Sequence, residues 1–175
     1  LKNVYYGTKI QVYVYLYAIE KTMGLKPFGA FYLPIVQSYG DATDENESDY
    51  KLYGYFLDDI NLVERADKTF NVEKGVSRFL QAKYSKTSTE NDKKFAYSKN
   101  LSKEEIDNIT KYSLDIVKQG IKEIVGGNIA VSPFDGECQF CKYKSICGID
   151  VILAGERKGV KITKNAFSEV ENKNG

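Results

Sequence analysis

The segment after Leu101 carries the strongest local folding signal, because a helix start, an amphipathic pattern and a helix stop follow one another. Ser102 and Glu105 have the spacing of a capping box, in which each side chain accepts a hydrogen bond from the other residue's backbone N–H. A stripe of apolar and small residues then recurs at helical spacing: Ile106, Ile109, Ser113, Ile116, Val117, Gly120, Ile121, Ile124 and Val125. Gly126 and Gly127 end the pattern, so we predict a long helix with one face packed on a core.

Two further helices are predicted on weaker signals. Apolar residues recur at helical spacing over Gly7–Met23 without an interrupting proline, and Gly24 follows, so we expect one helix there. Farther along the chain, Asp58 or Asp59 has the side chain of a helix N-cap. We expect that second helix to be short and to end near Ala66.

Strand signals fall between these helices. Two runs rich in aromatic and β-branched residues, Lys26–Tyr39 and Tyr50–Leu57, predict an antiparallel strand pair joined by a long acidic loop. Weaker strand predictions fall on Val76–Tyr84 and Phe95–Tyr97. Together the elements indicate an α/β (α+β) fold with a small mixed sheet flanked by helices.

The composition of the 175 residues excludes several classes of protein. The sequence contains no histidine, which rules out a histidine general base, a Ser-His-Asp triad and any histidine metal ligand. Lysine and arginine number 25 against 24 acidic residues, so no overall field attracts nucleic acid or a membrane surface. No apolar run approaches the roughly 20 residues of a membrane span, so we expect no membrane partner. The cysteines are odd in number and lie in one cluster, unlike those of a secreted disulfide domain, so we expect a reducing cytoplasmic location.

Three cysteines lie within ten residues and have the spacing C-x2-C-x5-C: Cys138, Cys141 and Cys147. The first two thiolates can hold one metal from a tight turn, and we expect the third at the start of a helix. A closed zinc or iron–sulfur site needs a fourth ligand, which would be Asp135, Glu137 or a cysteine upstream of this sequence. The alternative is three reduced thiols without a metal. A metal site is the favoured interpretation.

The first predicted helix opens with the letters YYG and contains Gln11 and Tyr15 at the spacing Q-x-x-x-Y. This pattern resembles the QxxxY motif of PD-(D/E)XK nucleases of RecB type. The segments KPFGAFYLPI, YKLYGYFLDD and LSKEEI follow in order, and then the three cysteines. In this order they resemble AddB, the family of B subunits of bacterial ATP-dependent helicase/deoxyribonucleases, over Val4–Ile149.

The resemblance implies a partial restriction-endonuclease-like nuclease core. Residues 1–150 would be the C-terminal half of a PD-(D/E)XK nuclease domain with its cysteine cluster, and residues 151–175 a C-terminal tail. Gln11 and Tyr15 would face the nuclease site and orient catalytic carboxylates or a DNA phosphate. Cys138, Cys141 and Cys147 would be three ligands of a 4Fe–4S cluster.

The resemblance also implies a reaction and partners. The intact protein would hydrolyse phosphodiester bonds with Mg²⁺ while double-strand DNA ends are processed for recombinational repair. Its partners would be DNA and an AddA-like helicase-nuclease subunit.

The sequence departs from the family pattern at the catalytic carboxylates. In the superfamily an Asp and a D/E-x-K motif precede the QxxxY helix, whereas only Leu1 to Tyr6 precede it here. We therefore expect a fragment without its catalytic half, with no catalytic residue of its own and no nuclease activity. Asp49 and Lys51 spell D-x-K but follow the helix, and we interpret them as solvated charges.

Other interpretations stay open from the sequence. A loosely basic region could contact phosphates or be a solvated hairpin: Lys83, Lys86, Lys93, Lys94 and Lys99. The chain could also come from a CRISPR-adaptation nuclease with QxxxY and a cysteine triplet. From a different class, it could be a zinc-ribbon-like binding module without nuclease ancestry, with Asp135 or Glu137 as the fourth zinc ligand.

Overall fold

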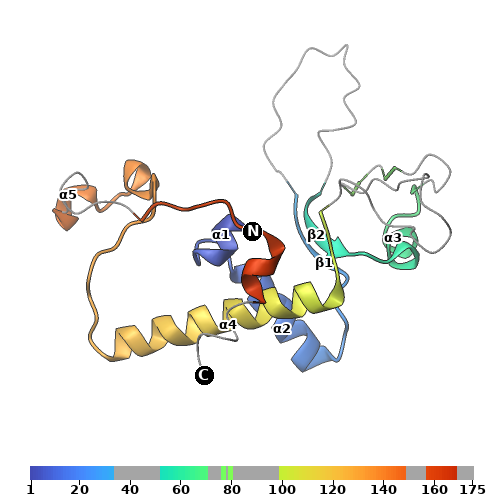
Figure 1. Ribbon diagram of the computed structural model, residues 1–175, viewed down its shortest axis with the longest axis horizontal. Coiled ribbons are helices and arrows are strands. Elements are labelled where there is room, and N and C mark those ends of the chain that lie inside the picture. The colour runs from blue at the N-terminus through green and yellow to red at the C-terminus, as the bar shows by residue number, and fades with distance from the viewer. Residues whose placement is uncertain (34–51, 71–75, 78, 81–98, 149–156, 169–175) are drawn as a thin grey trace, which may run out of the picture. The chain divides into compact units, whose positions relative to one another are not determined.

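The computed structural model (Figure 1) describes residues 1–33, 52–70, 76–77, 79–80, 99–148 and 157–168. The chain forms two compact units. The central unit is Gln11–Thr110, and the terminal unit combines Leu1–Ile10 with Lys111–Gly175. The terminal unit therefore brings together segments from both ends of the sequence.

A small mixed sheet organises the central unit, as predicted. Its strands β1 (Gly29–Tyr32), β2 (Tyr53–Leu57) and β3 (Asn100–Leu101) lie in the order β1-β2-β3. β1 and β2 are antiparallel, with Tyr32 opposite Tyr53, which confirms the predicted strand pair. β2 and β3 are parallel. The backbone approach is closest at Gly54, where a Cβ atom would overlap the carbonyl oxygen of Ala30.

One face of the sheet packs into an apolar core with α3 (Ile60–Ala66). The buried residues of this core are Phe56, Val63, Phe70 and Leu80, and the half-buried side chains against it are Phe28, Phe31, Leu52 and Ile60. Asp59 is the N-cap of α3, and its side chain accepts from the backbone N–H groups of Asn61 at 2.9 Å and Leu62 at 3.3 Å. The predicted capped helix ending near Ala66 is confirmed.

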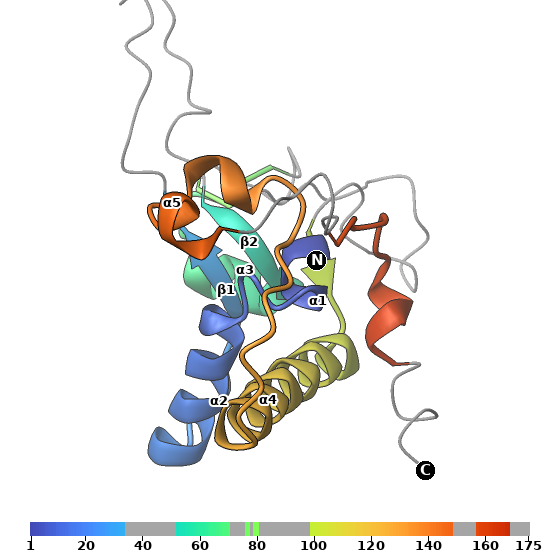
Figure 2. The same ribbon diagram turned by 90° about the vertical axis from the view of Figure 1, so that its left-hand side faces the viewer.

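The opposite face of the sheet lies against α2 (Gln11–Met23), which leads into β1 (Figure 2). Tyr13 and Leu16 are the buried residues of this helix. The phenol groups of Tyr55 and Tyr32 lie close enough to Tyr13 to interact with it electrostatically. Because Tyr32 pairs with Tyr53 and Ala30 with Tyr55, these tyrosines share one side of the sheet.

The longest described helix is α4 (Lys103–Val125), drawn yellow to orange in Figure 1. The predicted capping box is formed: Ser102 N–H donates to Glu105 at 2.7 Å, and Glu105 N–H donates to the Ser102 hydroxyl at 3.1 Å. The predicted apolar stripe is buried only in its first half. Its last three members are exposed by 56–82%: Ile121, Ile124 and Val125. Gly127, with φ of +76°, follows the end of the helix as predicted.

Aromatic side chains hold the terminal unit together. The Tyr5 ring, at the end of α1 (Lys2–Tyr5), stacks on Tyr112 with centroids 5.4 Å apart, and the Tyr112 hydroxyl donates to the Tyr5 carbonyl at 2.8 Å. Phe167, in the 3-10 helix η3 (Lys164–Phe167), meets both rings edge-on. The neighbouring Tyr6 ring packs on Phe134 at 4.7 Å. Two shorter elements, η2 (Glu137–Phe140) and α5 (Lys144–Cys147), follow α4.

The prediction of one helix over Gly7–Met23 is wrong at its start. The chain forms α1, turns, and begins α2 only at Gln11. Gly7 lies in this turn with φ of +78°, a left-handed conformation that glycine adopts readily and that interrupts a right-handed helix. Among the described helices, none is long and apolar enough to cross a membrane.

The strand predictions over Val76–Tyr84, Phe95–Tyr97 and the end of Lys26–Tyr39 can be tested only in part. In the described part of Val76–Tyr84, Leu80 forms a single bridge to Leu52 and no strand. The short β3 was not predicted. The acidic loop, the second half of Lys26–Tyr39, and all of Phe95–Tyr97 lie outside the described residues.

Candidate functional site

The Q-x-x-x-Y residues form a hydrogen-bonded pair on the exposed side of α2. Gln11 is the first residue of the helix, and Tyr15 follows one turn later with 55% of its surface exposed. The side-chain N–H of Gln11 donates to the Tyr15 hydroxyl oxygen at 2.5 Å. Tyr13 and Leu16 lie on another side of the helix, because each residue is rotated by about 100° from the one before it. Burial of these two residues fixes the direction in which Gln11 and Tyr15 face.

The pair offers hydrogen-bonding groups of both kinds. Since the Tyr15 oxygen accepts from Gln11, the hydroxyl hydrogen of Tyr15 is not used in that bond and can donate to a phosphate oxygen or a carboxylate. The carbonyl oxygen of Gln11 can accept from a water molecule. Neither side chain supplies a general base or a metal-binding carboxylate, so this pair can position groups but cannot perform hydrolysis alone.

Beneath the pair, Tyr13 is a structural residue. Burial, together with the nearby phenols of Tyr55 and Tyr32, raises the pKa of Tyr13 well above its ordinary value. Its hydroxyl therefore stays neutral at physiological pH. Burial likewise raises the pKa of Tyr55. These two tyrosines support the helix that carries Gln11 and Tyr15.

The three cysteines lie in an exposed part of the terminal unit. Cys138 is in η2 and is half-buried, Cys141 follows η2, and Cys147 is the last residue of α5. The prediction that the third cysteine starts a helix is therefore wrong: Cys147 ends α5, which Gly148 follows with φ of +63°. Phe140, between the first two cysteines, is 89% exposed.

The side chains of this segment do not form a closed ligand set. In the described ranges of the chain, no three cysteine, aspartate or glutamate residues are grouped so that they could hold a metal ion. Asp135 and Glu137, the candidate fourth ligands, are both exposed. The arrangement of the thiols therefore does not by itself fit a zinc ion or an iron–sulfur cluster.

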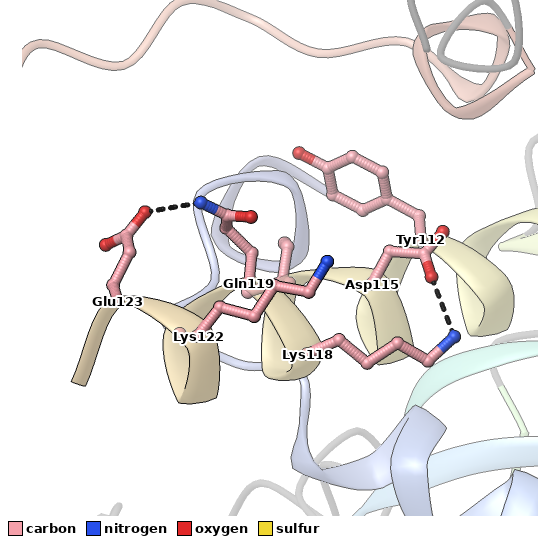
Figure 3. A pocket seen from close by; sticks show the side chains of 8 residues that line it. Tyr112, Asp115, Lys118, Gln119, Lys122 and Glu123 are labelled. Carbon is pink, nitrogen blue, oxygen red and sulfur yellow. Dashed lines mark hydrogen bonds and ion pairs between the residues drawn. The ribbon is translucent and has the colours of Figure 1, made fainter. Parts of the chain in front are cut away.

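An open pocket of about 640 Å³ lies along the part of α4 that belongs to the terminal unit (Figure 3). The lining includes two lysines and two acids, and Figure 3 shows Lys118 paired with Asp115 at 3.1 Å and Gln119 bonded to Glu123 at 2.8 Å. These contacts join residues of the same helix, and exposed pairs of this kind contribute little energy. None of the predicted site residues lines this pocket.

Of the remaining charged residues considered as site candidates from the sequence, only Lys99 lies in the part of the chain that the structure describes. Asp49, Lys51 and four lysines of the basic region lie outside the described residues. The fifth, Lys99, is exposed, and its ammonium lies 5.7 Å from the ring centroid of Tyr53. Neither Tyr53 nor its cross-strand neighbour Tyr32 was among the predicted site residues. Both lie within the aromatic-rich runs predicted as strands, and that aromatic content was the signal that could have identified them.

Comparison with known proteins supports nuclease ancestry for this chain. The sequence model of the PD-(D/E)XK nuclease superfamily matches residues 2–148. The B subunit of the ATP-dependent helicase/deoxyribonuclease from Thermoanaerobacter sp. (strain X514) is 28% identical over 175 aligned residues, which cover 90% of this chain and 15% of the relative. The protein of the same name from Alkaliphilus oremlandii (strain OhILAs) is 29% identical, and the alignment covers 94% of this chain and 16% of that relative.

The chain thus spans about 15% of the length of the curated relatives it matches. The match across residues 2–148 overturns the alternative of a zinc-ribbon-like module without nuclease ancestry. It also agrees with the mixed α/β architecture of the central unit, which the resemblance led us to expect. On this evidence the chain belongs to the PD-(D/E)XK nuclease superfamily.

Proposed function

We propose that this chain is part of the nuclease domain of a helicase–nuclease protein that processes double-strand DNA ends. The observation that supports this proposal best is the Gln11–Tyr15 pair, which is hydrogen-bonded, exposed and held in place by the buried side of α2. The relatives are named as B subunits of ATP-dependent helicase/deoxyribonucleases, which supports the same function. DNA and an AddA-like protein are the proposed partners.

In this function the pair positions reacting groups. The Tyr15 hydroxyl donates to a non-bridging oxygen of the scissile phosphate or to a carboxylate that binds the metal, and Gln11 fixes the orientation of that hydroxyl. PD-(D/E)XK nucleases typically use Mg²⁺, which polarises the phosphodiester and lowers the pKa of the attacking water. Carboxylates are the usual ligands of this ion, and the ten residues before Gln11 contain no Asp or Glu. We therefore expect no Mg²⁺-dependent cleavage by this chain alone.

The first test measures cleavage of linear DNA by the intact protein together with its helicase partner. Tyr15→Phe removes the hydroxyl but keeps the ring, and we expect cleavage about tenfold slower with unwinding unchanged. Tyr17→Phe is the matched control, since Tyr17 is also an exposed tyrosine of α2. Equal losses in both variants, or no loss in Tyr15→Phe, would contradict the proposed role.

A second test uses this chain alone with Mg²⁺ and linear DNA. The expected result is no cleavage above the level of a buffer control. Cleavage that depends on Mg²⁺ and disappears in Asp49→Ala would refute the assignment of the catalytic carboxylates to positions outside this chain.

We further propose that Cys138, Cys141 and Cys147 supply three ligands of a 4Fe–4S cluster, with a fourth thiolate from outside this chain. The support is the C-x2-C-x5-C spacing, because thiolates are the standard ligands of such clusters. Anaerobic purification, metal analysis and a visible absorption spectrum test the proposal. Iron with sulfide in the intact protein is the expected result, whereas this chain alone, with one ligand too few, should hold little or no iron. One zinc ion per chain would contradict it.

A further inference from the structure

Two tyrosines form an exposed aromatic pair on the sheet of the central unit. Tyr32 ends β1 and Tyr53 begins β2, and the two are directly opposite in the antiparallel register. Residues opposite one another project from the same face of a sheet, with Cβ atoms about 5 Å apart. Tyr32 is 50% exposed and Tyr53 is 44% exposed. The pair therefore presents two neighbouring ring surfaces to solvent, unlike Phe31 and Phe56, which pack in the core.

A cation accompanies this pair. The ammonium of Lys99 lies 5.7 Å from the centroid of the Tyr53 ring, within the range of a cation–π interaction. The backbone of Lys99 is anchored, because its carbonyl oxygen accepts from the N–H of Phe56 at 3.1 Å. Lys99 thus holds a positive charge beside the Tyr53 ring from a fixed point next to β3.

The pair also adjoins the helix of the candidate site. The phenol of Tyr32 interacts electrostatically with Tyr13, which is buried on the sheet-facing side of α2. Gln11 and Tyr15 lie on the same helix. A ligand that covers Tyr32 and Tyr53 therefore lies on the same face of the sheet as the element that presents the Q-x-x-x-Y pair.

The chemistry of this surface fits unpaired nucleobases. Flat aromatic rings stack on bases of any sequence, and a neighbouring cation attracts the phosphate between them. Duplex DNA hides its base faces within its own stack, so only a single strand can use the rings. A protein partner fits less well, because the centres of protein interfaces are depleted of charged side chains such as Lys99.

We propose that Tyr32, Tyr53 and Lys99 form a stacking platform that binds single-stranded DNA. The inference rests on the proposed function, in which the bound strand is the strand presented for cleavage. It adds to that function a binding surface that is separate from the Gln11–Tyr15 pair and from the cysteine segment.

The test is fluorescence anisotropy of a labelled oligothymidylate titrated with this chain in EDTA, so that cleavage plays no part. We expect tighter binding of the single strand than of a duplex of the same length. Tyr32→Ala and Tyr53→Ala should each weaken single-strand binding about tenfold, whereas the corresponding Phe variants should retain it. Lys99→Ala should reduce the slope of log affinity against log salt by about 0.7, the value for one phosphate contact.

Tyr17→Ala is the matched control. Tyr17 is exposed and has Lys21 at the same 5.7 Å from its ring, but it is on α2 and is not part of the cross-strand pair. The affinity of this variant for the single strand should stay unchanged. An equal loss in Tyr17→Ala would show that any tyrosine–lysine contact suffices, and this result would overturn the platform.

Other outcomes separate the platform from the proposed function. No single-strand binding, or unchanged binding in both alanine variants, overturns the platform and leaves the cleavage tests to decide the function. Retained binding with no cleavage by the intact protein overturns the proposed function alone. Self-association in sedimentation that disappears in Tyr53→Ala would identify the surface as a protein interface and would also overturn the platform.

Discussion

Asp67 is the buried charge whose removal gives the most informative test of the central unit. It follows α3 and is only 4% exposed. One carboxylate oxygen accepts from the backbone N–H of Thr69 at 2.8 Å and from its hydroxyl at 2.6 Å. The other accepts from the hydroxyl of Ser77 and, at 3.5 Å, from the N–H of Phe79. Asp67 therefore ties the end of α3 to the segment that contributes Leu80 to the core.

The cost of losing these contacts can be estimated from the donors left behind. In Asp67→Ala the hydroxyl of Ser77, itself 3% exposed, loses its acceptor, and such a buried unsatisfied group costs about 1–3 kcal/mol. The donors of Thr69 are near solvent and add about 1 kcal/mol. We expect Asp67→Ala to lower the free energy of unfolding by about 3 kcal/mol. Asp67→Asn keeps the shape and one acceptor and should cost about 2 kcal/mol.

The effect should depend on pH with a defined sign. Burial by itself raises the pKa of Asp67, but the hydrogen bonds from Ser77, Thr69 and Phe79 outweigh it, so the net pKa lies below its ordinary value. The folded carboxyl then contributes stability fully above its unfolded pKa of about 4, and this contribution is lost as pH falls through the folded pKa. The difference in free energy of unfolding between wild type and Asp67→Asn should therefore become smaller as the pH is lowered.

Urea unfolding followed by far-ultraviolet circular dichroism, at pH 7 and at several lower pH values, measures the loss of stability in each variant and its dependence on pH. Asp58→Asn is the matched control, because Asp58 is exposed and is expected to change stability by less than about 0.5 kcal/mol. The reasoning would be refuted by Asp67→Asn unfolding at the wild-type urea concentration at pH 7. A gap that widens toward low pH would refute the assigned direction of the pKa shift.

Three substitutions test the backbone geometry by the same unfolding measurement. Gly54→Ala should cost more than about 2 kcal/mol, because its Cβ would overlap the carbonyl oxygen of Ala30; wild-type stability would contradict the strand register. Gly120→Ala should instead stabilise α4 by about 0.5–1 kcal/mol, since no atom lies within 4 Å of the new Cβ, and a loss of stability would show an unexpected contact. Ser102→Ala should cost about 1 kcal/mol by removing the acceptor for Glu105 N–H, and an unchanged midpoint would argue against the capping box.

Elements with chemical signals at both ends were predicted well from sequence. The capping box at Ser102 and the two glycines after Val125 fixed α4, and Asp59 fixed the start of α3, because capping depends on residues within one turn. The predicted helix began four residues too early, because a glycine at the start of an apolar pattern has little effect on its periodicity, whereas Gly7 lies in a turn with φ of +78°. The parallel contact of β2 with β3 was missed for another reason: it joins Leu57 to Leu101, and no local signal encodes such a pairing.

In the candidate site, too, features set by nearby residues could be predicted and features that depend on packing could not. The spacing of Gln11 and Tyr15 was enough to predict that they share a helix face, since side chains four residues apart on a helix are neighbours. The spacing of the three cysteines predicts a shared metal, and this stays a prediction, because in the described residues no three candidate ligands are grouped around one point. The apolar stripe of α4 is continuous in the sequence, but its side chains are exposed from Ile121 onward. Periodicity shows which face of a helix is apolar and does not show how far along the helix the core extends, so this limit could not be predicted.

The aromatic cluster of the terminal unit has a consequence for the order of events during synthesis. The hydroxyl of Tyr6 accepts from the N–H of Val160, 154 residues away in sequence, and Tyr5 meets the ring of Phe167. These contacts cannot form until the segment around Phe167 has left the ribosome, whereas residues 11–110 can pair their strands earlier. The contacts of Tyr5 with Phe167 and of Tyr6 with Val160 therefore form after the strands of the central unit can pair. A nascent chain that stalls before Phe167 would present these rings, together with Tyr112, to chaperones.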